Sequence, residues 1–258
     1  MPKTSAQPAI ILIHGLRGNH FGVQDIAETL TKKYGYQVFA PDLPGSGTRP
    51  ELKDKTLDGY AKWFCNYIKK LKLDQPPIII GHSMGSIVTS YFIDKYPELV
   101  DRRVVLLSPI FRSPFGRAIS NIEYALMSGA LHLLPKKPRY NLMRSKPVSF
   151  LISHFLTVDK SKQKEIDLLH YRYCLFASAD SLLADCKISM QKETIIPENK
   201  EILFCFGNRD KLGSVKRSIS RVKEAKQTYK IIKNKGHLIN YECPKTVARL
   251  IAEFIGEN

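Results

Sequence analysis

One pentapeptide in this chain combines residue types that could perform nucleophilic chemistry. Gly81-His82-Ser83-Met84-Gly85 follows directly after the apolar run Pro77 to Ile80 and precedes a segment with helical periodicity. In the pattern G-x-S-x-G the serine occupies the apex of a tight turn from a strand into a helix, where small neighbours let the two elements approach closely. The helix N-terminus below it favours developing negative charge. We predict that Ser83 is a nucleophile, and the simple alternative is a helix-capping serine.

A serine hydroxyl is a weak nucleophile unless a general base accepts its proton. His237 stands after the last predicted strand and before the final helix, in a loop at the carboxyl edge of the sheet. An imidazole at that edge can reach over the turn that carries Ser83. We therefore predict that His237 is the base rather than a surface histidine. The remaining histidines are assigned to turns, to the surface or substrate, and to a helical segment: His14, His20, His82, His132, His154 and His170.

An acid must orient the base and stabilise its protonated form. Asp210 follows the apolar run Ile202 to Phe206, again at a carboxyl edge, and precedes His237 by 27 residues. Asp185 is the second candidate, although it falls in the helical segment, and a helix-capping role is the simple alternative for Asp210. The order Ser83, Asp210, His237 is the order of the triad in folds that use the G-x-S-x-G turn.

Acyl transfer also requires donors for the oxyanion of the tetrahedral intermediate. The backbone N–H of Met84, the residue after the nucleophile, is one predicted donor. The backbone N–H of Leu16, which follows His14-Gly15 at the end of the first strand, is the other. Loss of one such donor costs on the order of 3 kcal/mol of transition-state stabilisation.

The elements that must position these residues follow from the hydrophobic pattern. Short apolar runs, typical of strands buried in a parallel sheet, alternate with segments of helical periodicity. The fold class predicted is α/β, a mostly parallel central sheet with helices on both faces. The predicted strands cover residues 9–13, 36–40, 77–80, 104–107, 202–206 and 228–232, and the clearest predicted helices cover 21–34, 60–71 and 244–255.

The alternation stops after Pro109. Residues 110–195 show helical periodicity and no convincing strand, so we predict a core made of residues 1–109 and 196–258 and a helical cap made of residues 110–195. Cap residues would decide which substrate is accepted, because they would cover the carboxyl edge of the sheet. The many aromatic and aliphatic residues of the cap are expected mostly to pack the cap helices together.

Composition and charge limit the classes of function. The chain has 258 residues, 43% of them hydrophobic, and a net charge of +16. Five scattered cysteines include no C-x-x-C pair, which indicates neither a zinc site nor a disulfide framework. No apolar run is long enough to span a membrane, and the first eight residues do not resemble a secretory signal, so a cytoplasmic location is expected.

The basic excess is concentrated in two stretches. Residues 136–147 hold five basic side chains and no acid, and residues 209–235 hold ten bases and two acids. A solvated surface explains both, and attraction to an anionic membrane surface or substrate is the sharper hypothesis. Nucleic-acid binding is not favoured, because no recognised motif accompanies the charge.

Taken together, these motifs resemble the α/β-hydrolase superfamily. The resemblance rests on His14-Gly15-Leu16-Arg17-Gly18, Asp42-Leu43-Pro44-Gly45-Ser46-Gly47, the Ser83 pentapeptide, Asp210 and His237. The residues around Ser83 are similar to those of monoacylglycerol lipases, small carboxylesterases and carbon–carbon bond hydrolases. Many relatives have a second glycine after this pentapeptide, where this chain has Ser86. The resemblance implies no metal and no organic cofactor.

The sequence therefore predicts a serine hydrolase of a lipid-like or small carboxylic ester, acting through an acyl-enzyme. Thioester hydrolysis, carbon–carbon bond hydrolysis and acyl transfer to an alcohol would use the same three groups and stay open as alternatives. A non-catalytic ligand receptor is a contrasting hypothesis, against which the ordered triad speaks. The expected partner is a small acyl ester, and the expected assembly is a monomer or a weak homo-oligomer.

Overall fold

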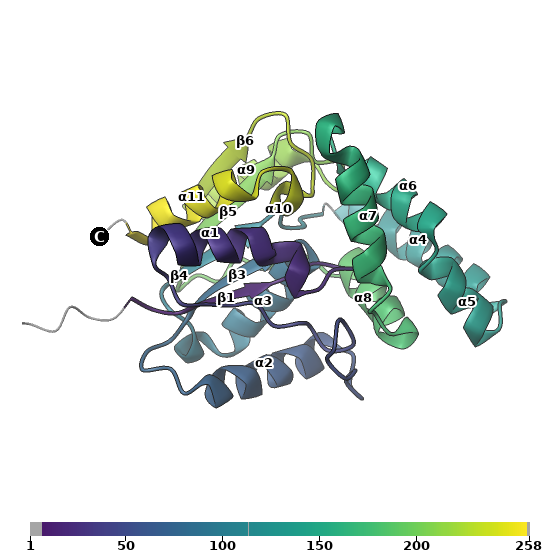
Figure 1. The fold of residues 1–258 in the computed structure, drawn as a ribbon, viewed down its shortest axis with the longest axis horizontal. Helices are drawn as coiled ribbons and strands as arrows, with labels where there is room; N and C mark the ends of the chain where they lie inside the picture. Colours follow the sequence, from purple (N-terminus) through teal and green to yellow (C-terminus); the bar gives the residue numbers. More distant parts are fainter. Residues whose placement is uncertain (1–6, 113, 257–258) are drawn as a thin grey trace, which may run out of the picture.

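A single parallel sheet organises the chain. The computed structural model describes residues 7–112 and 114–256, and its six strands are ordered β2-β1-β3-β4-β5-β6, all neighbours parallel (Figure 1). The strands are β1 Ile10–Ile13, β2 Val38–Phe39, β3 Ile78–His82, β4 Arg103–Leu107, β5 Glu201–Gly207 and β6 Thr228–Ile232. The predicted α/β class is confirmed.

The strand at one edge is shorter than its sequence predicted. A strand was expected over residues 36–40, and β2 has two residues, paired as Ile10↔Val38 and Ile11↔Phe39. An edge strand has a partner on one side only, and here β1 itself has four residues, so few ladder positions exist. The predicted helix over residues 21–34 likewise begins as a 3₁₀ turn, His20–Val23, before α1.

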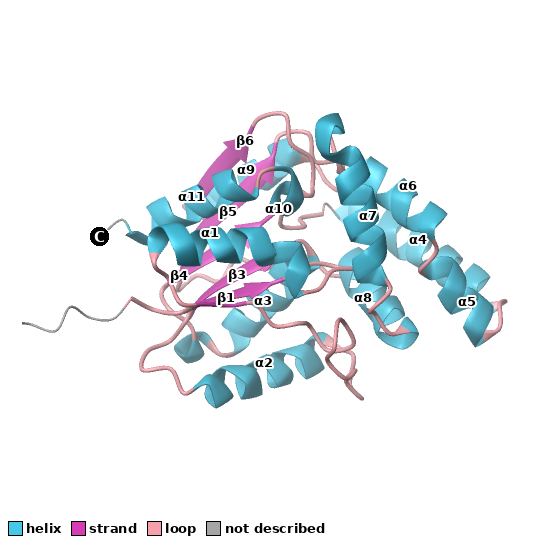
Figure 2. Ribbon diagram, viewed as in Figure 1, coloured by secondary structure: helices cyan, strands magenta, loops and turns pink. Residues whose placement is uncertain are grey.

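Helices cover both faces of the sheet (Figure 2). Side chains along each strand alternate between the two faces, so Ile11 and Ile13 pack on one side while Ile10 and Leu12 pack on the other. Helices α2, α3 and α9 cover the first face, and α1 and α11 cover the second. Their bounds are α1 Gln24–Tyr34, α2 Leu57–Leu71, α3 Met84–Lys95, α9 Val215–Glu224 and α11 Pro244–Gly256, with the short α10 Ile239–Glu242 and the 3₁₀ turn Pro97–Leu99.

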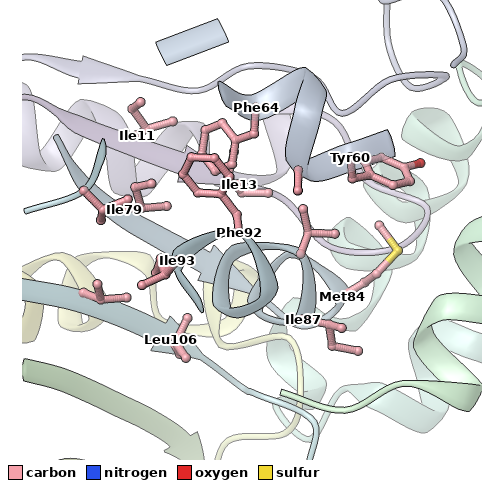
Figure 3. Packing of buried hydrophobic residues seen from close by; sticks show 14 of the residues in the cluster. Ile11, Ile13, Tyr60, Phe64, Ile79, Met84, Ile87, Phe92, Ile93 and Leu106 are labelled. Atoms are coloured by element: carbon pink, nitrogen blue, oxygen red, sulfur yellow. The ribbon is translucent and has the colours of Figure 1, made fainter. Parts of the chain in front are cut away.

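Aromatic side chains fill the space between β3 and helices α2 and α3 (Figure 3). Phe64 of α2 and Phe92 of α3 are fully buried, with ring centroids 4.6 Å apart. They pack among Ile79 of β3 and Ile11 and Ile13 of β1. This packing fixes α3, the helix that begins immediately after Ser83, against the sheet.

Between β4 and β5 the described residues form helices and no strand. These are α4 Pro114–His132, α5 Lys136–Met143, α6 Lys146–Leu156, the 3₁₀ turn Lys160–Lys162, α7 Gln163–Cys174 and α8 Ala179–Gln191. They lie together beyond one end of the sheet, on the side of the molecule away from the marked C-terminus (Figure 1). The division of the chain into a core and a separate cap stays a prediction.

None of the helices within residues 7–112 and 114–256 combines the length and the apolar character that a membrane crossing needs. Residues 1–6, part of the N-terminal stretch from which no secretory signal was expected, lie outside the described part of the chain. The cytoplasmic location stays a prediction.

Candidate active site

Ser83 occupies the turn between β3 and α3. Its backbone has φ 54° and ψ −121°, a positive φ that a residue with a side chain rarely adopts. Such a conformation costs of order 1–3 kcal/mol and persists only where the surroundings enforce it. Here the Ser83 amide donates to the carbonyl of Leu107 in β4 at 2.9 Å, which anchors the turn to the neighbouring strand.

Two glycines make this turn sterically feasible. A Cβ at Gly81 would come within 2.5 Å of the Gly85 carbonyl oxygen, and a Cβ at Gly85 within 2.5 Å of the His14 carbonyl oxygen. Any larger residue at either position would therefore collide with backbone. Ser86, the departure from the family pattern, is fully buried and donates its hydroxyl to the Gly81 carbonyl at 2.8 Å. That hydrogen bond satisfies the extra polar group.

The three predicted triad residues meet in space. His237 Nε2 lies 2.7 Å from Ser83 Oγ, and His237 Nδ1 lies 2.7 Å from Asp210 Oδ2. Both side chains around the imidazole are shielded, since Ser83 is 8% exposed and Asp210 has 8% of its side chain exposed. With the Nδ1–H donating to the carboxylate, Nε2 is left to accept the serine proton.

Close packing of two loops brings Asp210 and His237 together. A Cβ at Gly207, the last residue of β5, would lie 2.1 Å from the Gly236 carbonyl oxygen, so only glycine permits this approach. The Arg209 amide donates to the Lys235 carbonyl at 3.0 Å, and the buried Glu242 carboxylate accepts the Gly236 amide at 3.1 Å. The His237 amide itself donates to the carbonyl of Leu156, the last residue of α6, at 2.9 Å.

Burial and hydrogen bonds set the protonation states of Asp210 and His82. Burial raises the pKa of Asp210, but the charge and hydrogen bond of His237, with the Leu212 amide, outweigh it and lower the pKa below its ordinary value. Burial lowers the pKa of His82 to about 3, so its ring is neutral. His82 Nε2 lies 3.2 Å from the His237 carbonyl, to which a neutral ring donates, so His82 holds the His237 backbone in place.

The loop after β1 also lies close to Ser83. A Cβ at Gly15 would lie 3.0 Å from the Ser83 Cβ. His14 fixes this loop, because its Nδ1 lies 2.9 Å from the Gly15 carbonyl and its Nε2 accepts the Leu43 amide at 2.9 Å. Leu16 follows this glycine, and Met84 begins α3, which places both predicted amide donors on the segments that flank Ser83. Their oxyanion role stays a prediction.

A cavity of about 530 Å³ opens onto Ser83 and His237. Most of its lining is apolar and comes from the helices after β4 as well as from the core: Leu16, Ile110, Leu151, Phe155, Met190 and Leu238.

Two buried cavity residues were not singled out by the sequence. Arg17 has φ 62° and is 6% exposed, and its guanidinium donates to the Met143 carbonyl at 2.8 Å and to Ser149 Oγ at 2.7 Å. It ties the loop that carries the Leu16 amide to α5 and α6. Burial lowers the pKa of His170 to about 3. The sequence did not place either residue in the cavity. For Arg17 the reason is that both of its partners lie more than a hundred residues away along the chain.

The alternative candidates lie elsewhere. Asp185, the second candidate acid, is buried on α8, where its carboxylate accepts the Tyr60 hydroxyl at 2.5 Å rather than contacting His237. His20 is bound to Asp42 through Nδ1 at 2.8 Å, in the loop after β2. Within residues 7–112 and 114–256, no three His, Cys, Asp or Glu side chains gather as metal ligands would.

Comparison with known proteins identifies the fold. A family model described as the alpha/beta hydrolase fold matches residues 8–132. An esterase from Exiguobacterium antarcticum superposes with a TM-score of 0.78 over 98% of this chain and 93% of that chain, at 15% identity. The chain has the α/β-hydrolase fold. Within this fold, β3, the Ser83 turn and α3 form the strand–turn–helix unit in which α/β-hydrolases carry their nucleophile.

The curated relatives match different shares of this chain. The sn-1-specific diacylglycerol lipase ABHD11 of Mus musculus is 28% identical over 108 residues, 42% of this chain and 35% of the lipase. The (E)-2-((N-methylformamido)methylene)succinate hydrolase of Acinetobacter baylyi is 26% identical over 243 residues, 92% of this chain and 86% of that enzyme. The chain spans about a third of the length of the first curated relatives that it matches, 36% and 35%.

Proposed function

We propose that the protein is a serine hydrolase that cleaves carboxylic esters through a covalent acyl-enzyme, with Ser83, His237 and Asp210 as its catalytic triad. The observation that carries this proposal is the pair of 2.7 Å contacts on the two nitrogens of one buried imidazole. Neither a helix-capping serine nor a surface histidine requires that arrangement.

The proposed reaction has two halves that use the same groups. Ser83 Oγ attacks the ester carbonyl while His237 Nε2 accepts its proton, and Asp210 stabilises the imidazolium that forms. The amides of Leu16 and Met84 bind the oxyanion. His237 then donates the proton to the departing alcohol. Water, deprotonated by His237, attacks the acyl-enzyme and restores Ser83 with release of the carboxylic acid.

The cavity supports an apolar acyl group as the substrate portion. Leu151 and Phe155 of α6 and Met190 of α8 line it together with Ser83. Apolar walls around few polar groups favour hydrocarbon chains over polar ones. We propose that the helices between β4 and β5, within residues 110–195, act as the cap that sets chain length. We also propose that the protein makes a peripheral contact with an anionic membrane and that it is monomeric or weakly associated.

Ester hydrolysis and active-site labelling test this function. Wild-type protein should hydrolyse p-nitrophenyl esters of medium acyl length faster than the acetate, and a fluorophosphonate should label Ser83. Ser83→Ala should abolish both, because it removes the hydroxyl that lies 2.7 Å from His237 Nε2. The matched control is Ser86→Ala, a neighbouring buried serine whose hydroxyl is engaged with the Gly81 carbonyl.

Equal rates in wild type and Ser83→Ala, or labelling that survives this substitution, would contradict the proposal. Turnover of thioesters or of vinylogous diketones with little ester cleavage would instead favour the alternative bond classes. Transfer of the acyl group to added alcohols in preference to water would indicate an acyltransferase.

A further inference from the structure

Helix α4 exposes an apolar row along its length. Ile119, Ile122 and Leu126 are 41%, 60% and 69% exposed, and Leu133, one residue beyond the helix, is 86% exposed. Spacings of three, four and seven residues place these side chains on one face of a helix. We call these four residues the α4 stripe. Other residues of α4 are only half-buried where the helix packs against α8.

Exposure of this kind is unusual for a soluble surface. Single exposed leucines are common, but a contiguous row of large aliphatic side chains marks an interaction site. The row ends at Leu133-Leu134-Pro135, an apolar connection between α4 and α5, and Leu134 is 37% exposed as well. Water therefore contacts a substantial apolar surface that a partner would cover.

Basic side chains border the stripe. Lys136, Lys137 and Lys146, here the basic collar, are exposed and begin α5 and α6. Residues 118–156 contain five bases and a single acid, Glu123. Lys136 pairs with Asp180 at 2.9 Å, whereas in the described part of the chain Lys137 and Lys146 have no carboxylate partner.

The same region leads into the active-site cavity. Leu151 and Phe155 of α6 are 72% and 49% exposed, yet both line the cavity that holds Ser83. An apolar molecule bound on the outside of α4 and α6 would therefore lie next to the opening of the cavity. Helices α4, α5 and α6 occupy the end of the molecule far from the marked C-terminus (Figure 1).

We propose that the α4 stripe and the basic collar dock the protein on the interface of an anionic lipid bilayer. The aliphatic side chains enter the boundary between headgroups and acyl chains, and the lysines contact anionic headgroups. A second copy of this chain fits less well, because a symmetric contact would bring the two basic collars together. Docking itself is independent of catalysis, and delivery of a membrane-derived ester to Ser83 rests on the proposed function.

Sedimentation with vesicles of ether-linked lipids tests docking without any hydrolysable ester. Wild-type protein should bind ether-linked phosphatidylcholine vesicles that contain ether-linked phosphatidylserine at least about tenfold more tightly than neutral vesicles. Ile122→Glu with Leu126→Glu should weaken binding about a hundredfold, because two large aliphatic side chains no longer enter the interface. As a control, Ile231→Glu places a single glutamate at an aliphatic residue that is 45% exposed on β6, and this variant should bind as wild type does.

The basic collar is tested with matched charge reversals. Lys137→Glu with Lys146→Glu should weaken binding to the anionic vesicles at least about twentyfold and make it insensitive to salt. Lys69→Glu with Lys70→Glu changes net charge equally on the exposed end of α2 and should have little effect.

Three results would contradict docking. The first is equal binding to neutral and anionic vesicles, and the second is unchanged binding of either surface variant. The third is a stable dimer that dissociates in the stripe variant. If a fluorophosphonate labels Ser83 but the protein does not bind vesicles, docking and the membrane contact are contradicted and the proposed ester hydrolysis is not. If the protein binds vesicles but cleaves no ester, only the proposed ester hydrolysis is contradicted.

Discussion

At the scale of single residues, the site depends on groups that are unusual in conformation or charge. Ser83 has a positive φ, and the imidazole of His237 is 2% exposed between a hydroxyl and a carboxylate. The carboxylate of Asp210 stays ionised because the contacts with His237 and the Leu212 amide lower its pKa despite burial. Each feature costs stability unless its neighbours compensate, which is why they cluster where chemistry is proposed.

Asp210→Asn should lower kcat for ester hydrolysis by about four orders of magnitude. Asparagine keeps the shape but has no charge, and its amide can hold the imidazole in the wrong tautomer, so Nε2 no longer accepts the serine proton. Steady-state kinetics on p-nitrophenyl esters measure this effect. Asp185→Asn is the matched control, because that carboxylate contacts Tyr60 and not the base. A larger loss from Asp185→Asn would assign the acid to α8 instead.

At the scale of elements, the turn between β3 and α3 depends on close approach of backbone to backbone. β1 runs beside β3, and the carbonyls of its last residue, Ile13, and of the following His14 face Gly85 at distances that leave no room for a side chain. The loops after β5 and β6 meet through Gly207 in the same way. The catalytic geometry proposed here is therefore set by strand pairing and by glycine, and side-chain packing only supports it.

Gly85→Ala should destabilise the fold by about 3 kcal/mol or more, because its methyl would lie 2.5 Å from the His14 carbonyl oxygen and 2.6 Å from the Ile13 carbonyl oxygen. Gly129→Ala provides the opposite control. Nothing lies within 4 Å of a Cβ at Gly129, which is inside α4, so this change should stabilise the protein by about 0.5–1 kcal/mol. Urea denaturation measures both, and similar values for the two variants would contradict the proposed crowding.

At the scale of the whole molecule, a buried contact between α2 and α8 adds to those of Arg17 and His237 in tying the helices after β4 to the core. The Tyr60 hydroxyl on α2 donates to the Asp185 carboxylate on α8, and both side chains are almost fully buried. Burial raises the pKa of Asp185 to about 7, and the hydrogen bond from Tyr60 only partly opposes this shift. Attachment of α8 to the core thus depends on a carboxyl group that titrates near neutrality.

Stability should therefore fall as pH rises through neutrality. An unfolded aspartate titrates near pH 4, so the folded state binds this proton more tightly; the resulting stabilisation is complete below about pH 4 and is lost as pH rises to about 7. Asp185→Asn removes this titration. Relative to the variant, the wild type should lose about 2 to 3 kcal/mol of unfolding free energy between about pH 5 and about pH 8. Parallel pH profiles for the two proteins would contradict this assignment.

The sequence by itself determined the parallel α/β class, the position of every strand and the order Ser83, Asp210, His237, because those features follow from local hydrophobic runs and from the turns that end them. The length of β2 was predicted wrongly, since the sequence indicated residues 36–40 and the strand has two residues. Which buried carboxylate reaches His237, where Arg17 finds its partners, and which face of α4 is left to solvent were decided only by tertiary structure. Each depends on contacts between segments far apart along the chain, and helical periodicity alone does not say what covers an apolar face.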